Sequence, residues 1–79
     1  MAKKKVTLIF PKDLIKEPVI YRMAKDYDII PNIRRARVTE EVGEVVLELE
    51  GTEDNLNRGT EYLVNIGVKV EPVEGDILE

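Results

Sequence analysis

A polar segment after Pro31 holds the residue types best suited to binding a ligand: Asn32, Arg34, Arg35 and Arg37. A guanidinium group binds carboxylates and phosphates through paired hydrogen bonds. The Asn amide can donate to a carboxylate or accept from an ammonium group. This segment could therefore hold an anion or an amino acid.

A structural explanation competes with this one for each residue. Arg35 and Arg37 can pair with glutamates on a neighbouring strand, and we favour that interpretation for both. Arg34 points the other way in a regular strand and is the better ligand candidate. Asn32 can instead satisfy the local backbone at a strand entrance, so both of its roles stay open.

Several residue types that carry catalysis are absent. The chain has no His, Cys or Trp, which excludes a Cys–His metal site and the nucleophilic mechanisms that need Cys or His. Its acidic side chains are expected to be solvated, although acid–base work by paired carboxylates stays open. We therefore predict a non-enzymatic protein with no metal site and no cofactor. The net charge of −4 argues mildly against nucleic-acid binding.

The length of 79 residues indicates one domain over 1–79, with residues 1–4 and 74–79 as flexible ends. A core this small supplies a modest stability margin, and self-association would bury more apolar surface. No secretory signal is visible, and no segment approaches the roughly 20 apolar residues that span a bilayer. These features predict a soluble cytoplasmic protein without membrane insertion, unless it is cut from a longer chain.

The chain shows two hydrophobic periodicities, one typical of strands and one typical of helices. Alternation predicts strands over 5–10, 30–38, 45–50 and 68–72. Spacing of three and four predicts helices from Pro18 to Tyr27 and from Thr52 towards Gly67. The alternation of apolar and polar residues in the second strand is imperfect, because Ile33 is apolar at a position of the other face. A bulge within 32–35 would explain this irregularity.

Individual residues mark the element ends. Pro18 suits the first helical position, and Thr52 suits an N-cap. Gly43 supplies a positive φ for the hairpin over 39–43 if one is needed. Gly59 inside the second helix suggests close packing on the sheet, and Gly67 suits a helix C-terminus.

The element order is βαββαβ. Right-handed crossovers place both helices on one face of a four-stranded antiparallel sheet, which is the ferredoxin-like α+β arrangement. The expected core is Val6, Leu8, Phe10, Ile20, Met23, Ala36, Val38, Val45, Leu47, Leu49, Leu56, Leu63, Val68 and Val70. The open face is expected to show Thr7, Ile9, Arg35, Arg37, Val46, Glu48, Glu50, Lys69 and Glu71.

Three segments together resemble a known family. Asn32-Ile33 opens the second strand, the strand Val45–Gly51 reads Val-Val-Leu-Glu-Leu-Glu-Gly, and Gly67–Glu71 reads Gly-Val-Lys-Val-Glu. In this order, and over about Val6–Val73, the chain resembles the NIL domain. The resemblance implies a ferredoxin-like fold. NIL domains occur at the C-terminus of methionine-importer ATPase subunits, where they form dimers and bind methionine to restrain transport. Others precede ferredoxin domains or stand alone.

The resemblance also implies a ligand site. Asn32 matches the family's ligand-holding Asn, and Val45 and Val46 match the strand start beside the pocket. We expect a methionine-like amino acid at Asn32, Ile33, Arg34, Val45 and Val46, at the interface of a homodimer. Arg34 stands where the family motif has Leu, which would narrow or recharge the pocket. The chain has neither an ATPase motif nor cluster-ligating Cys, so it would be a regulatory or accessory module.

A partner surface is a separate expectation. Ile9, Ile33 and Val46 are predicted to form an apolar patch on the open sheet, and such patches often mark interfaces. Scattered exposed apolar residues are the ordinary alternative. The last residues, including Ile77 and Leu78, could dock on a neighbour, although a frayed tail is the default.

Two other functions share this topology. RNA-binding domains of this kind stack bases on strand aromatics, but the predicted open face has none. Acylphosphatase needs an Arg in the loop after the first strand, and residues 11–17 contain none. An accessory domain of a ferredoxin or a sulfur-metabolism protein, acting by protein contact, is the main alternative to ligand binding.

Overall fold

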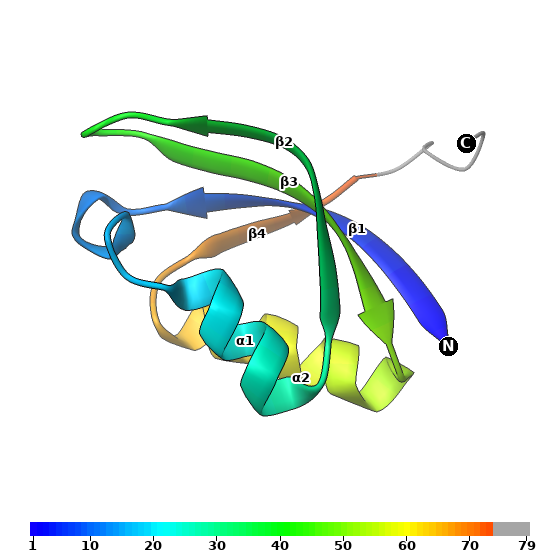
Figure 1. Ribbon diagram of the computed structural model, residues 1–79. Coiled ribbons are helices and arrows are strands. Elements are labelled where there is room, and N and C mark those ends of the chain that lie inside the picture. Colours follow the sequence, from blue (N-terminus) through cyan, green and yellow to red (C-terminus); the bar gives the residue numbers. More distant parts are fainter. Residues whose placement is uncertain (74–79) are drawn as a thin grey trace.

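The structure is a computed structural model, and it describes residues 1–73. Its elements run β1 (Ala2–Phe10), the short 3-10 helix η1 (Lys12–Leu14), α1 (Val19–Tyr27), β2 (Ile30–Val38), β3 (Gly43–Gly51), α2 (Glu53–Asn65) and β4 (Lys69–Pro72). Within these residues the strands form one antiparallel sheet in the order β2-β3-β1-β4. Both helices lie on the same side of it (Figure 1). The predicted ferredoxin-like fold is confirmed.

The core lies between the helices and the two central strands. Its buried residues are Val6, Leu8, Val19, Met23, Ile29, Val45, Leu47, Leu49, Leu56, Leu63 and Val68. Phe10, Ile20 and Val70 pack against this core while partly exposed. Val19 and Ile29 were missing from the predicted core because Val19 is the first residue of α1 and Ile29 lies between α1 and β2, where periodicity is least informative.

The core prediction was wrong for two residues of β2. Ala36 and Val38 are exposed, Val38 to 59%. Both occupy the helix side of the sheet, because their register partners Val45 and Gly43 are buried there. Strand parity thus predicted the correct face, but no helix covers that part of β2.

The predicted bulge in β2 is confirmed. The register with β3 shifts between Ile33 and Arg35. Figure 1 shows β2 bending along its length, so that its last half runs out with β3 beyond the helices. A bulge bends its own strand in this way. The bend leaves the outer half of the hairpin without a helix beneath it.

Local signals were largely read correctly at α2. The Thr52 hydroxyl accepts a hydrogen bond from the Asn55 N–H at 3.0 Å, and Gly67 takes a φ of 106°. Gly59 is buried, and a Cβ there would collide with Ile29 Cδ1 and lie 3.4 Å from Met23 Cγ. Gly59 therefore packs closely against α1 and the residue before β2, whereas the prediction placed this close contact on the sheet.

Three end assignments differ from expectation. Pro18 is the N-cap of α1 and not its first helical residue. Gly43 begins β3, and positive φ occurs instead at Asp28 and Gly67 among the described residues. β1 begins at Ala2, which pairs with Gly51. Flexibility of residues 1–4 stays a prediction, and the predicted tail 74–79, with Ile77 and Leu78, lies outside the described residues.

Candidate functional site

The uncovered underside of β2 borders an apolar groove on the helix side of the sheet. Its volume is about 290 Å³, and its other wall is the segment leading into α1. We call it the β2 groove. It is lined by Phe10, Ile15, Glu17, Pro18, Val19, Ile20, Tyr21, Ile33, Ala36, Val38, Gly43 and Val45. A groove of this size and lining suits one small apolar side chain.

Gly43 lines the β2 groove where the loop after β1 packs against the start of β3. A Cβ at this position would lie 3.2 Å from Ile15 Cγ1 and 3.3 Å from Phe10 Cβ. These distances are tighter than ordinary van der Waals contact. The glycine therefore lets the loop pack against β1 and β3 while leaving space further out beneath β2.

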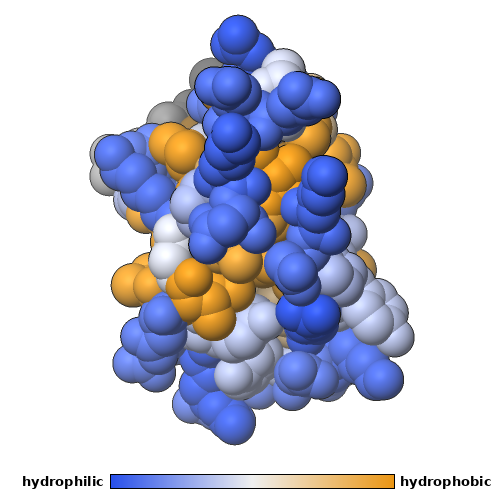
Figure 2. Space-filling view, turned by 90° about the vertical axis from the view of Figure 1, so that its left-hand side faces the viewer, coloured by the Kyte–Doolittle hydropathy of each residue, from blue (hydrophilic) through white to orange (hydrophobic). Residues whose placement is uncertain are grey.

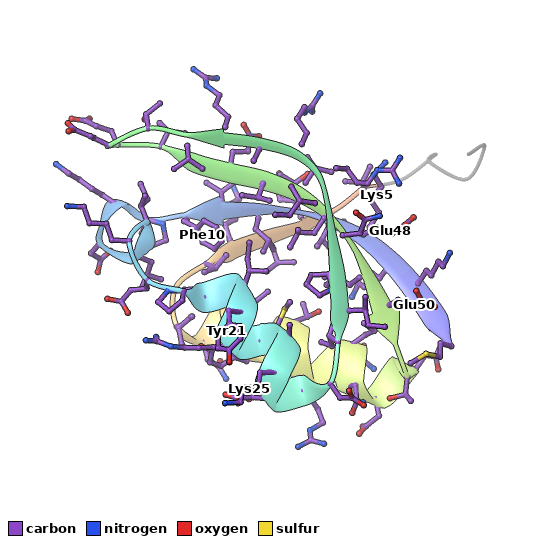
Figure 3. The ribbon with its side chains drawn as sticks, viewed as in Figure 1. Lys5, Phe10, Tyr21, Lys25, Glu48 and Glu50 are labelled. Atoms are coloured by element: carbon purple, nitrogen blue, oxygen red, sulfur yellow. The ribbon has the colours of Figure 1, made fainter. Side chains whose placement is uncertain are left out.

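The rim of the β2 groove is polar. Glu17 lines it, and its carboxylate pairs with the Arg22 guanidinium at 3.3 Å. The Tyr21 ring is 62% exposed, and the Lys25 ammonium lies 5.8 Å from its centroid. Figure 3 shows Tyr21 and Lys25 on the outer side of α1. Charged groups of both signs thus lie beside an apolar slot.

A larger hollow of about 700 Å³ lies between η1 and the hairpin turn. Its lining is mostly charged and exposed: Lys12, Asp13, Ile15, Lys16, Thr39 and Glu40. The turn is fixed by Thr39, whose hydroxyl accepts from the Glu41 and Val42 N–H groups at 3.2 and 3.0 Å. Because its walls are solvated, this hollow is a weaker site for an apolar ligand than the β2 groove.

The open face of the sheet carries a third concavity. It has a volume of about 420 Å³ and is lined by Lys5, Thr7, Arg34, Arg35, Val46 and Val73. We call it the open-face hollow. It lies on the side away from the helices, where Lys5 and Glu48 are register partners and lie near each other (Figure 3).

The five predicted ligand-binding residues are divided between the two faces. Ile33 pairs with buried Leu47 and lines the β2 groove with Val45. Asn32 pairs with Glu48, so its side chain lies on the open face. Arg34 and Val46 line the open-face hollow. The sequence therefore identified residues of two concavities and joined them into one.

The predicted apolar patch is divided in the same way. Ile9 and Val46 lie on the open face, because their partners Glu44 and Thr7 do. Ile33 lies on the helix side, so its placement on the open sheet was wrong. The exposed apolar residues of the β2–β3 hairpin are instead Ile33 and Val38 on the helix side and Val42 at the turn. Figure 2 shows apolar residues among the hydrophilic ones at that end of the molecule.

The arginines also differ from expectation. Arg34 does not point to the helix side, since its guanidinium lies 3.8 Å from the Glu48 carboxylate on the open face. Arg37 lies opposite Glu44 in the register. Among residues 1–73, however, neither Arg35 nor Arg37 forms an ion pair within 4.0 Å. The favoured cross-strand pairing of these two arginines is therefore not seen.

Sequence reasoning missed most of the lining of each concavity. Ile15, Pro18 and Tyr21 complete the β2 groove, and the available signal was Ile15, an apolar residue in a charged loop. Thr7 and Lys5 complete the open-face hollow, for which the signal was their parity with Ile9. Within the described chain, no cluster of three acidic residues could hold a metal ion, and no helix is long and apolar enough to cross a membrane.

Comparison with known proteins now identifies the fold family. The family model described as the NIL domain matches residues 4–72. The chain belongs to the NIL domain family. This NIL domain also resembles the crystal structure of the C-terminal domain of an ABC transporter ATP-binding protein from Enterococcus faecalis, with a TM-score of 0.78 and 23% identity. The match covers 92% of this chain and 86% of that one. No curated protein sequence matched this NIL domain.

Proposed function

We propose that this NIL domain is a non-catalytic regulatory module that binds a methionine-like amino acid. The observation that supports it is the β2 groove, an apolar slot left open because α1 does not cover the second half of β2. An unbranched thioether side chain adapts to irregular apolar gaps. In this proposal the Glu17 carboxylate at the rim, which pairs with Arg22 at 3.3 Å, also accepts a hydrogen bond from the ligand's ammonium group.

The proposed ligand binds where a second copy would pack. β2 is an edge strand of nine residues, so one side of its backbone has unpaired N–H and C=O groups. Ile30, Ile33 and Val38 are each more than half exposed along it. A second copy lying along this edge would bury these side chains and close the β2 groove. Asn32 on the other side of the same strand would then lie at the interface.

Regulation follows from mass action. A ligand that binds only the dimer stabilises it, by about 2.7 kcal/mol at a hundredfold excess over the dissociation constant. We propose that the module acts in the cytoplasm, attached to a transport ATPase or standing alone. The alternative is an accessory domain that uses the same exposed edge for contact with a ferredoxin or sulfur-metabolism protein.

A pair of matched variants tests the ligand site. Val38 in the β2 groove is 59% exposed, and Val64 on α2 is 55% exposed and lies outside it. In Val38→Asp the carboxylate would be solvated and the groove polar, so the fold should survive while ligand binding fails. L-methionine should raise the melting temperature of the wild type and of Val64→Asp, and should leave that of Val38→Asp unchanged.

The dimer is tested by measuring mass in solution with and without L-methionine. A dimer that strengthens with methionine supports the proposal. A monomer whose melting temperature does not respond to millimolar methionine would overturn the amino-acid function and favour the accessory-domain alternative.

A further inference from the structure

The bulge in β2 aims two consecutive arginines at the same face. Successive side chains of a regular strand point to opposite faces. Arg35 pairs with Val46 on the open face, and Arg34 reaches Glu48 on that same face. The register shift between Ile33 and Arg35 is what breaks the alternation. Bulges commonly redirect a side chain at a functional site.

The two guanidinium groups meet further groups suited to an anion. Lys5 and Thr7 come from β1, and Val46 comes from β3. Val73 closes one end, held by a hydrogen bond of 3.0 Å from its N–H to the Lys5 carbonyl. In the described part of the chain, three cationic side chains and no carboxylate line the open-face hollow.

The acidic groups among residues 1–73 compensate the two arginine charges incompletely. The Arg34–Glu48 pair spans 3.8 Å with both side chains partly exposed, so it is weak. The Glu71 carboxylate, on the same face opposite Thr7, pairs with Lys69 at 3.3 Å. Arg35 forms no ion pair within residues 1–73. Within residues 1–73, this concavity therefore holds one weakly paired arginine and one arginine without an ion pair.

We propose that the open-face hollow binds a small organic dianion, either a dicarboxylate or a phosphate monoester. Arg34 and Arg35 would each bind oxyanion oxygens through paired hydrogen bonds, and the Thr7 hydroxyl would donate a third. Val46 and Val73 would contact the carbon skeleton. The volume of about 420 Å³ exceeds what a bare inorganic ion fills. This site is on the opposite face from the β2 groove and does not depend on the ligand proposed there.

The test is a titration of the full chain followed by amide NMR. Succinate and glycerol 3-phosphate are the probes, and neutral succinamide is the control for the carbon skeleton. Both dianions should shift the Thr7 and Val46 amide signals at millimolar concentration, whereas succinamide should not. Signals unmoved by either dianion, or moved equally by succinamide, would overturn the proposal.

Three arginine variants distinguish a specific dianion site from general electrostatic attraction of anions to this face. Arg34→Gln and Arg35→Gln should each weaken dianion binding about tenfold, as loss of one charged hydrogen-bonding group does. Arg37→Gln removes the same charge from the same face but from outside the hollow. It should change the affinity less than twofold, by about 0.4 kcal/mol at most. An equal loss in all three variants would mean that the face attracts anions without a site.

Discussion

β2 and β3 are paired strands of nine residues each, yet their environments are opposite. β3 alternates between buried and half-buried residues along its whole length, whereas no residue of β2 is buried. The difference does not come from composition alone, since β2 holds Ile30, Ile33 and Val38. It comes from position, because β3 is flanked by two strands and covered by helices while β2 is an edge that bends away from them. We therefore expect β3 to contribute most to stability, and we assign the proposed ligand and partner contacts to β2.

The largest expected effect contrasts two register partners. Leu47 in β3 is fully buried, and Ile33 opposite it in β2 is 57% exposed. Leu47→Ala should cost about 2–5 kcal/mol of unfolding free energy through lost burial and a cavity. Ile33→Ala should cost below about 1 kcal/mol. Urea unfolding of dilute protein measures both, and an equal loss for Ile33 would show that β2 is covered in solution.

A middle-sized effect is expected where β2 does meet the helices. Gly59→Ala places a methyl group against Ile29, the buried residue just before β2. The crowding should destabilise the fold by about 1–3 kcal/mol, partly offset by the roughly 1 kcal/mol gain in helix propensity.

The double variant Ile29→Val/Gly59→Ala is the control for that crowding. Valine lacks the Cδ1 methyl group that the new side chain meets, so the alanine should cost less in this background. Thermal unfolding of the four proteins gives the coupling energy. Strictly additive effects would contradict close packing of α2 on the entrance to β2.

The smallest of the three effects concerns the helix caps. α2 is capped by the Thr52 side chain, whereas α1 begins after Pro18 without a side-chain cap. Thr52→Ala should therefore cost about 1 kcal/mol. Pro18→Ala removes no capping hydrogen bond and should cost less, as read from the unfolding midpoint. A larger loss at Pro18 would mean that the wall of the β2 groove contributes more to stability than its exposure indicates.

Much of the fold could be predicted from sequence because hydrophobic periods report local geometry. The strand 30–38 was placed correctly and its bulge was expected from the apolar Ile33. Periodicity does not show which surface a neighbouring element covers. Ala36 and Val38 were therefore assigned to the core although α1 stops short of them.

The candidate site was less predictable for a related reason. A bulge position that is uncertain by one residue reverses the face of each side chain beside it. Asn32 and Ile33, adjacent in the family motif, lie before the bulge and on opposite faces, because successive side chains alternate along a regular strand. Arg34 faces away from the side expected of a regular strand. The sequence identifies the segment that contains the candidate site. Only the register with β3 shows which of its side chains lie at each of the two concavities.

The strand order also has a consequence for how the chain folds. β1 lies inside the sheet, with Thr7 between Val46 and Glu71. Only the β2–β3 hairpin joins neighbouring segments, so the remaining strand pairs must close long loops before gaining contacts. Such non-local pairing slows folding. We expect the hairpin, whose strand β2 has no buried residue, to be the earliest pair to associate, with β1 joining only after β3 has been synthesised.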